Sequence, residues 1–133
     1  MKKIFIIFVT YLLSTTISSA ALSQWTKVVE SQDGYVSYID FNKLKIVNDF
    51  VYFWELEDFP YPHKDGTMSL KTYHQVDCSL NAVKYHKYAS YNLSMGEGNP
   101  IDIWSRTEKK WKTPKNGSVL FIRILKVCNF VKN

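Results

Sequence analysis

The chain has few of the residues that enzymes and metal proteins use for chemistry. Its 133 residues include three histidines and two cysteines. His63, His74 and His86 follow no zinc-binding spacing, and we expect them at surface or half-buried positions. There is no Gly-x-Ser-x-Gly motif and no free cysteine paired with a histidine, which would mark a nucleophile. The sequence therefore predicts no catalytic residues, no metal site and no cofactor, and we expect a protein that is not an enzyme.

Glycine is also scarce, with five residues in the chain. Two of them lie close together in Met95-Gly96-Glu97-Gly98, but a phosphate loop needs more glycine and a following helix, which Pro100 disfavours. We expect a turn there. The acidic residues Glu55, Glu57, Asp58 and Asp65 lack the spacing of a calcium-binding EF-hand, and we expect them to form an ordinary solvated edge.

The chain lacks an apolar run of membrane length. Its longest, Ile4 to Leu13, is short of the roughly 20 residues that a spanning helix needs. The run follows Lys2 and Lys3 and precedes small residues ending in Ser18-x-Ala20, as in a secretory signal peptide. We predict a signal peptide at residues 1–20 and a single domain at residues 21–133, without a membrane span after cleavage. An uncleaved membrane anchor is the alternative.

The predicted cleavage point has no cysteine beside it, so the sequence lacks the lipobox of a bacterial lipoprotein. We expect an exported protein that is periplasmic, extracellular or on the cell surface. Cys78 and Cys128 are the whole cysteine content, and such a pair in an oxidising compartment predicts a disulfide. Two free buried thiols or half of a metal site remain as alternatives.

The charge balance is mildly basic. The formal net charge is +5, and removal of Lys2 and Lys3 with the leader would lower it to about +3. This favours acidic surfaces or polysaccharides weakly as partners, and no nucleic-acid partner is expected for an exported protein.

Alternating apolar and polar residues predict a sheet-rich fold. The predicted strands are Trp25–Ser31, Tyr35–Asp40, Phe50–Asp58, Met68–Asp77, Ala82–Tyr91 and, shorter, Ile101–Trp104. In the clearest of them, Phe50, Tyr52 and Trp54 share one face, and Val51 and Phe53 share the other with the glutamates that follow.

The period changes after Gly117. Phe121, Ile124, Leu125 and Cys128 recur at helical spacing, and Ser118 is placed as an N-cap, although β-branched residues leave a strand as the rival. The predicted fold class is α+β, an antiparallel sheet of about five to six strands packed by a C-terminal helix and closed by one disulfide.

The pattern most suggestive of binding is the basic segment, residues 104–115. Cations next to aromatic rings suit an acidic protein or a sulfated polysaccharide. The candidate binding residues are Trp104, Arg106, Lys109, Lys110, Trp111, Lys112 and Lys115. The alternative is a solvated loop whose tryptophans lie under the helix.

Landmarks along almost the whole predicted domain resemble the surface-adhesin protein E family of Gram-negative bacteria. They are Trp25, Tyr38-Ile39-Asp40, Trp54, Ser69, Asp77-Cys78, Tyr88, Met95-Gly96-Glu97-Gly98, Trp111, Pro114, Gly117-Ser118 and Cys128. The resemblance implies an antiparallel sheet packed by a C-terminal helix, and a disulfide between Cys78 and Cys128.

The best-known member of that family is a surface lipoprotein that binds vitronectin and laminin and can dimerise. The resemblance therefore implies an adhesin-like binding protein, with an extracellular-matrix or other envelope protein as partner and a homodimer as one assembly. Fold alone does not fix function. The alternative function is a soluble periplasmic structural or housekeeping protein without a host ligand, which the missing lipobox favours.

Overall fold

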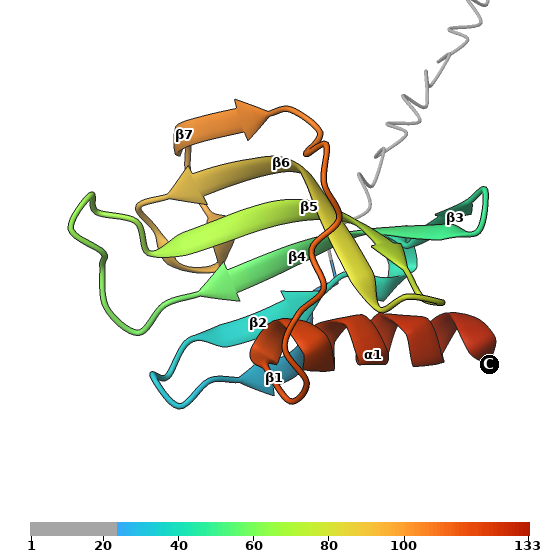
Figure 1. Ribbon diagram of the computed structural model, residues 1–133. Helices are drawn as coiled ribbons and strands as arrows, with labels where there is room; N and C mark the ends of the chain where they lie inside the picture. Colours follow the sequence, from blue (N-terminus) through green and yellow to red (C-terminus); the bar gives the residue numbers. More distant parts are fainter. Residues whose placement is uncertain (1–23) are drawn as a thin grey trace, which may run out of the picture.

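The structure is a computed structural model that describes residues 24–133, so the predicted signal peptide and the first residues of the predicted domain lie outside it. Within the described range, seven strands form one antiparallel sheet and a single α-helix follows them (Figure 1). The strands are β1 (Thr26–Glu30), β2 (Val36–Ile39), β3 (Lys45–Val47), β4 (Phe50–Asp58), β5 (Ser69–Asp77), β6 (Ala82–Tyr91) and β7 (Pro100–Ser105). The helix is α1 (Val119–Lys132), and two short 3-10 turns are η1 (Phe41–Lys43) and η2 (Ser94–Gly96).

The predicted fold class is confirmed, with one more strand than expected. The order in the sheet is β1-β2-β4-β5-β6-β7, and β3 pairs with β4 beside this path. The extra strand is β3, whose three residues are all exposed and are too few to show a clear alternation. It forms a hairpin with β4 through Asn48 and Asp49, both at positive φ, which suits a tight hairpin turn.

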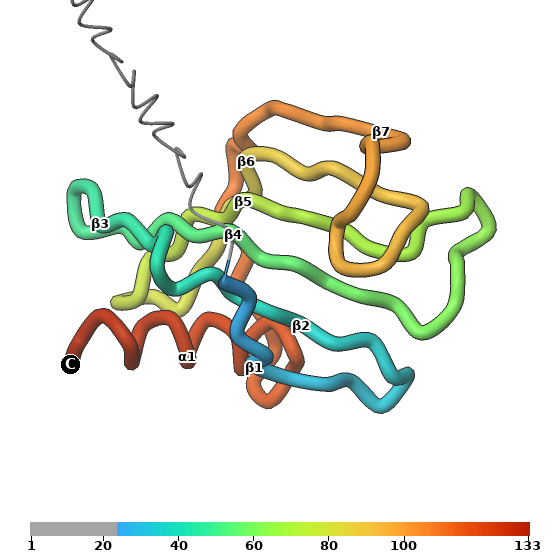
Figure 2. Tube along the Cα trace, turned by 180° about the vertical axis from the view of Figure 1, so that it is seen from behind, coloured from blue at the N-terminus to red at the C-terminus, as the bar shows by residue number. Residues whose placement is uncertain are grey.

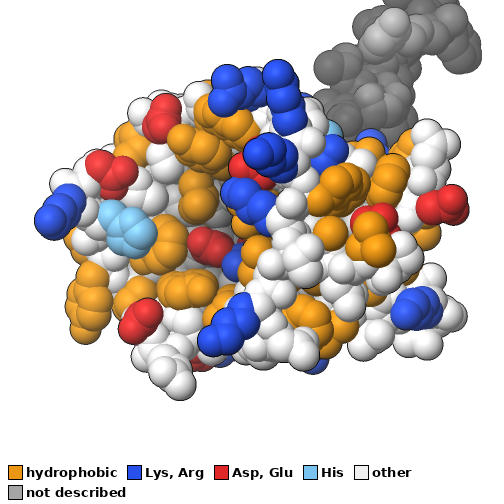
Figure 3. All heavy atoms as spheres, in the orientation of Figure 1, with side chains coloured by type: hydrophobic (Ala, Val, Ile, Leu, Met, Phe, Trp, Pro, Cys, Tyr) orange, Lys and Arg blue, Asp and Glu red, His pale blue; other side chains and the backbone are white. Residues whose placement is uncertain are grey.

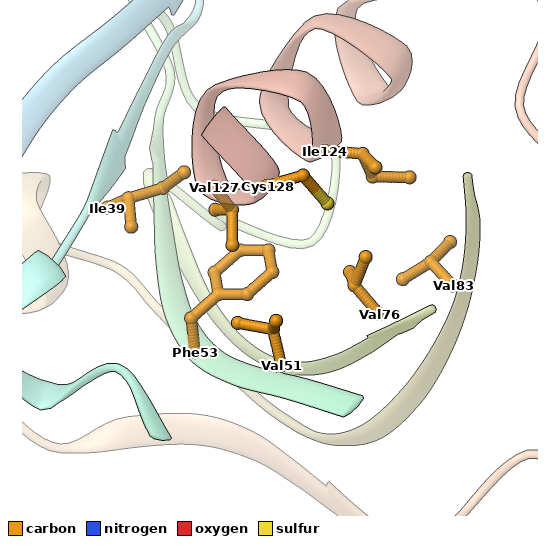
Figure 4. Close-up of a cluster of buried hydrophobic side chains, with 8 residues drawn as sticks. All are labelled: Ile39, Val51, Phe53, Val76, Val83, Ile124, Val127 and Cys128. Carbon is orange, nitrogen blue, oxygen red and sulfur yellow. The ribbon is translucent and has the colours of Figure 1, made fainter. Parts of the chain in front are cut away.

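The core lies between α1 and one face of the sheet, here called the helix face. Val51 and Phe53 of β4 point toward the helix with Val76 of β5, and Ile124 and Val127 meet them from α1 (Figure 4). The opposite side, here called the back face, carries the alternate residues of the same strands. In the view from behind, no helix crosses β4, β5 or β6 (Figure 2).

Ser118 caps the helix as predicted, since its hydroxyl accepts a hydrogen bond from the Phe121 amide at 3.2 Å. The buried stripe differs from the prediction. Arg123, Ile124, Val127 and Cys128 are buried, whereas Leu125 is 36% exposed. Leu125 was expected inside because it shares the helical spacing of Phe121, Ile124 and Cys128, and the observed stripe is turned toward Arg123 and Val127.

The disulfide joins Cys78 to Cys128, with 5.7 Å between their Cα atoms, and fastens α1 to the end of β5. Asp77 next to it accepts hydrogen bonds from the amides of Ser79 and Leu80, as expected of an aspartate at a strand end.

The predicted glycine turn is η2. It lies on the back face, next to the carboxyl end of β4 and the amino end of β5. Met95 and Gly96 both have positive φ, and the Gly96 amide donates to the Ser69 hydroxyl at 2.8 Å. Asp58 accepts from the Ser94 hydroxyl and from the Met95 amide. Asp58 is therefore an anchor for this loop, which the expectation of a solvated acidic edge did not foresee.

Candidate binding surface

The basic segment continues the edge of the sheet beyond β7. The amides of Arg106 and Glu108 donate to the carbonyls of His86 and Tyr85, and Val83 and Lys112 exchange two hydrogen bonds of 2.9 Å. The segment is therefore paired along β6 instead of looping freely. Figure 1 shows it passing from β7 down to α1.

Its side chains divide between the two faces of the sheet. Trp104 stacks on Tyr88 with 5.7 Å between ring centroids, and Trp111 packs on Phe50 at 5.3 Å. Both tryptophans thus pack against aromatic side chains of the sheet.

Most of the predicted cations come together. Arg106, Lys109, Lys110 and Lys112 are exposed and line a shared hollow of about 530 Å³ with Trp104. In Figure 3 lysine and arginine side chains gather in a row over this part of the molecule. The Lys112 ammonium already has partners within the protein. It lies 2.9 Å from the Glu108 carboxylate and 4.3 Å from the centroid of the Tyr85 ring.

Two predicted residues lie outside this hollow. Trp111 turns toward the back face, where the Lys84 ammonium sits 4.7 Å above its ring. Lys115 belongs to the approach to α1, and its carbonyl accepts from the Ser118 amide. The cationic surface is thus Arg106, Lys109 and Lys110, with Lys112 at its inner side.

A second hollow of about 290 Å³ lies beside this surface on the helix face. Tyr85, Tyr88 and Trp104 form its aromatic wall, and Glu57 and Arg123 reach its floor. Figure 3 shows acidic and basic side chains in a depression framed by apolar ones.

The floor of this second hollow is a buried ion cluster. The Arg123 guanidinium contacts the carboxylates of both Glu55 and Glu57, and His74 Nε2 lies 2.6 Å from Glu55 Oε2. Glu55 and His74 are each 2% exposed. Two expectations were therefore wrong: Glu55 does not belong to a solvated edge, and His74 is neither a surface nor a half-buried residue.

Burial decides the ionisation of this cluster. It lowers the pKa of His74 to about 4, so this imidazole is neutral at pH 7. It also lowers the pKa of Arg123 to about 10, which leaves the guanidinium charged. Burial raises the pKa of Glu57, which shares its one cation with Glu55.

The sequence held a signal for this cluster. Glu55 has the same strand parity as Val51 and Phe53, and His74 has that of Val76, so alternation already placed both toward the core. In residues 24–133, no group of three or more His, Cys, Asp or Glu side chains is arranged to hold a metal ion. The same range holds no helix with both the length and the hydropathy needed to cross a lipid bilayer.

The comparison with protein families decides the relationship. The family model for surface-adhesin protein E matches residues 25–129. The chain belongs to the surface-adhesin protein E family. This membership makes it an adhesin-like surface protein and confirms the resemblance seen in the sequence. No curated protein sequence matches the chain.

Solved structures of Haemophilus influenzae protein E share the fold. Crystal form II has a TM-score of 0.63 at 15% identity, with 84% of this chain and 91% of that chain covered. A second protein E structure gives 0.61 at 16% identity, with 84% and 89% covered. Protein E from a non-typeable strain gives 0.53 at 16% identity, with 84% and 79% covered. At such identities the likeness concerns the protein E fold and carries no binding residues across.

Proposed function

We propose that the chain is an exported, non-enzymatic adhesin-like protein that binds acidic regions of host matrix glycoproteins such as vitronectin or laminin through its basic segment. The observation that supports this most is the row of exposed Arg106, Lys109 and Lys110 on a backbone fixed by pairing to β6. A fixed backbone reduces the ordering cost of binding, and clustered cations speed the encounter with an acidic partner.

The test is charge reversal in the pair Lys109→Glu and Lys110→Glu, measured by surface plasmon resonance on immobilised vitronectin and laminin. We expect wild-type binding to weaken as salt rises from about 50 to 300 mM, because exposed charges are screened. The reversed variant should bind about tenfold more weakly or worse. Lys112 stays unchanged, since its pairing with Glu108 is part of the fold.

The matched control is Lys126→Glu with Lys132→Glu, which makes the same charge change at exposed positions of α1. This control should retain wild-type affinity. Equal binding by the two double variants, or no binding by the wild-type protein, would overturn the proposed contact surface.

Export is tested by external protease on intact cells, with the medium and a periplasmic extract probed in parallel. Cleavage on intact cells, or protein in the medium, supports the adhesin proposal. Protection until the outer membrane is opened supports the alternative, a soluble periplasmic structural or housekeeping protein.

A further inference from the structure

The back face of the sheet carries aromatic side chains, whereas the solvated face of an antiparallel sheet usually presents polar ones. Trp54 of β4 and Tyr73 of β5 lie in register, and their ring centroids are 4.9 Å apart. Tyr52 is 6.1 Å from Tyr73 and 5.7 Å from His86, which extends the same row toward β6. An apolar face of this kind, left uncovered by α1, indicates an interaction surface.

Two hollows adjoin on this face and share Trp54 and Lys43. One, of about 200 Å³, lies between Trp25, Trp54 and Tyr91. The other, of about 350 Å³, lies between Trp54 and Tyr73 and reaches Lys45. Together they form a shallow groove lined by half-buried aromatic side chains, a surface on which a row of flat sugar rings can lie.

The charge of the groove is positive. The Lys71 ammonium lies 4.8 Å from the centroid of the Tyr91 ring, and the Lys87 ammonium lies 6.0 Å from that of the Tyr73 ring. Lys45 lines the hollow of about 350 Å³. The acid that lines the hollow of about 200 Å³ is Asp40, which is 1% exposed and whose carboxylate lies 3.8 Å from the Lys43 ammonium. Burial, and to a smaller extent the nearby charge of Lys43, lower the pKa of Lys71, whose ammonium donates to the Gly96 carbonyl at 2.9 Å.

This charge also selects the occupant. A second copy docked by the same face would bring lysines against lysines, since a two-fold interface opposes identical patches. A purely apolar partner would desolvate these ammonium groups without pairing them.

We infer that the aromatic and lysine-lined groove on the back face, between Trp25 and Tyr73, binds an acidic oligosaccharide. The sugar rings would stack on Trp54 and Tyr73 while the carboxylate or sulfate groups pair with Lys45 and Lys87. This site lies on the opposite face from the cationic hollow of the basic segment and does not depend on it.

The four tryptophans of the chain make a direct test, because each indole N–H gives its own NMR signal. The probe is a hyaluronan hexasaccharide added to the ¹⁵N-labelled protein. We expect the signals of Trp25 and Trp54 to shift, and that of Trp104 on the helix face to stay in place. Shifts confined to Trp104 and Trp111 would assign the probe to the basic segment and overturn the inference, as would no shift at millimolar probe.

Three variants locate the site. Lys45→Glu with Lys87→Glu, both exposed, should weaken binding about tenfold or more. Trp54→Leu should do the same by removing a stacking surface, with circular dichroism used to verify folding. Lys109→Glu with Lys110→Glu should bind the hexasaccharide like wild type, which separates this test from that of the proposed function.

Two further ligands fix the chemical class. Neutral cellohexaose should bind more weakly than hyaluronan, because it offers the lysines no anion. A six-nucleotide oligothymidylate also combines rings with anions. Equal binding of cellohexaose, or equal binding of the oligonucleotide with the same tryptophan shifts, would overturn the assignment to an acidic oligosaccharide.

Discussion

At Arg123 a guanidinium lies between the carboxylates of Glu55 and Glu57 on the buried side of α1. Removal of one partner from a buried ion pair leaves an uncompensated charge, which typically costs about 3–5 kcal/mol. We therefore expect Arg123→Met to lower the free energy of unfolding by about that amount in urea denaturation at pH 7. Lys126→Met on the exposed side of α1 is the control, and equal losses would show that the cluster contributes little.

His74 should make stability depend on pH in a defined direction. In the unfolded chain it takes up a proton near pH 6.5, but the folded protein resists until about pH 4. Between these values the unfolded state binds more protons, so the folded state loses stability as pH falls. We expect wild type to lose about 2 kcal/mol more than His74→Gln between pH 7 and 4.5. The exposed His63→Gln should follow wild type, and a His74→Gln curve parallel to wild type would contradict this.

At the scale of elements, η2 depends on a glycine that no other residue can replace without strain. Gly96 has a φ of 65°, and a Cβ atom there would lie 2.2 Å from Lys71 Cε. The Lys71 ammonium also donates to the Gly96 carbonyl at 2.9 Å, so a displaced lysine would lose this bond.

We expect Gly96→Ala to lower the free energy of unfolding by about 2–3 kcal/mol. Gly66→Ala is the matched control, because Gly66 has a φ of 87° but no neighbour within 4 Å of the added Cβ. It should lose only about 1 kcal/mol, which measures the backbone strain alone. Equal losses in urea denaturation would show that contact with Lys71 is irrelevant.

The elements also show how far the sequence alone could lead. The bounds of β4 and β6 were predicted correctly, because long strands with one buried face alternate clearly. The helix and its cap at Ser118 followed from local spacing. β3 was missed, since its stability comes from pairing with β4 and not from a buried face.

The candidate site was less accessible to such reasoning. The cations of the basic segment were visible as a run, but the pairing of this segment with β6 joins residues that are twenty or more positions apart. Alternation along β4 places Glu55 and Glu57 on the same face as Val51 and Phe53, but the contacts of these glutamates with Arg123 link residues that are more than 60 positions apart in the sequence. The back-face groove required the register of β4 against β5, which no single strand contains.

At the scale of the whole molecule, one disulfide cross-links the helix to the sheet. The disulfide between Cys78 and Cys128 spans a sequence separation of 50 residues. The chain-entropy model gives about 4 kcal/mol for a loop of this length.

We expect Cys78→Ala with Cys128→Ala to lower the free energy of unfolding by about 2–4 kcal/mol. Reductant should bring wild type to a similar value and leave the double variant unchanged, and urea denaturation with and without dithiothreitol measures both. A wild-type protein that unfolds identically with and without reductant would contradict a stabilising role for the bond.

The position of Cys128 in α1, after all seven strands, also fixes the order of events in biosynthesis. A chain that emerges from its amino end presents the thiol of Cys78 long before its partner exists. During this interval the disulfide contributes nothing, and the sheet can rely only on the pairing of its strands. The disulfide can therefore form only after α1 has been made and has packed beside Cys78.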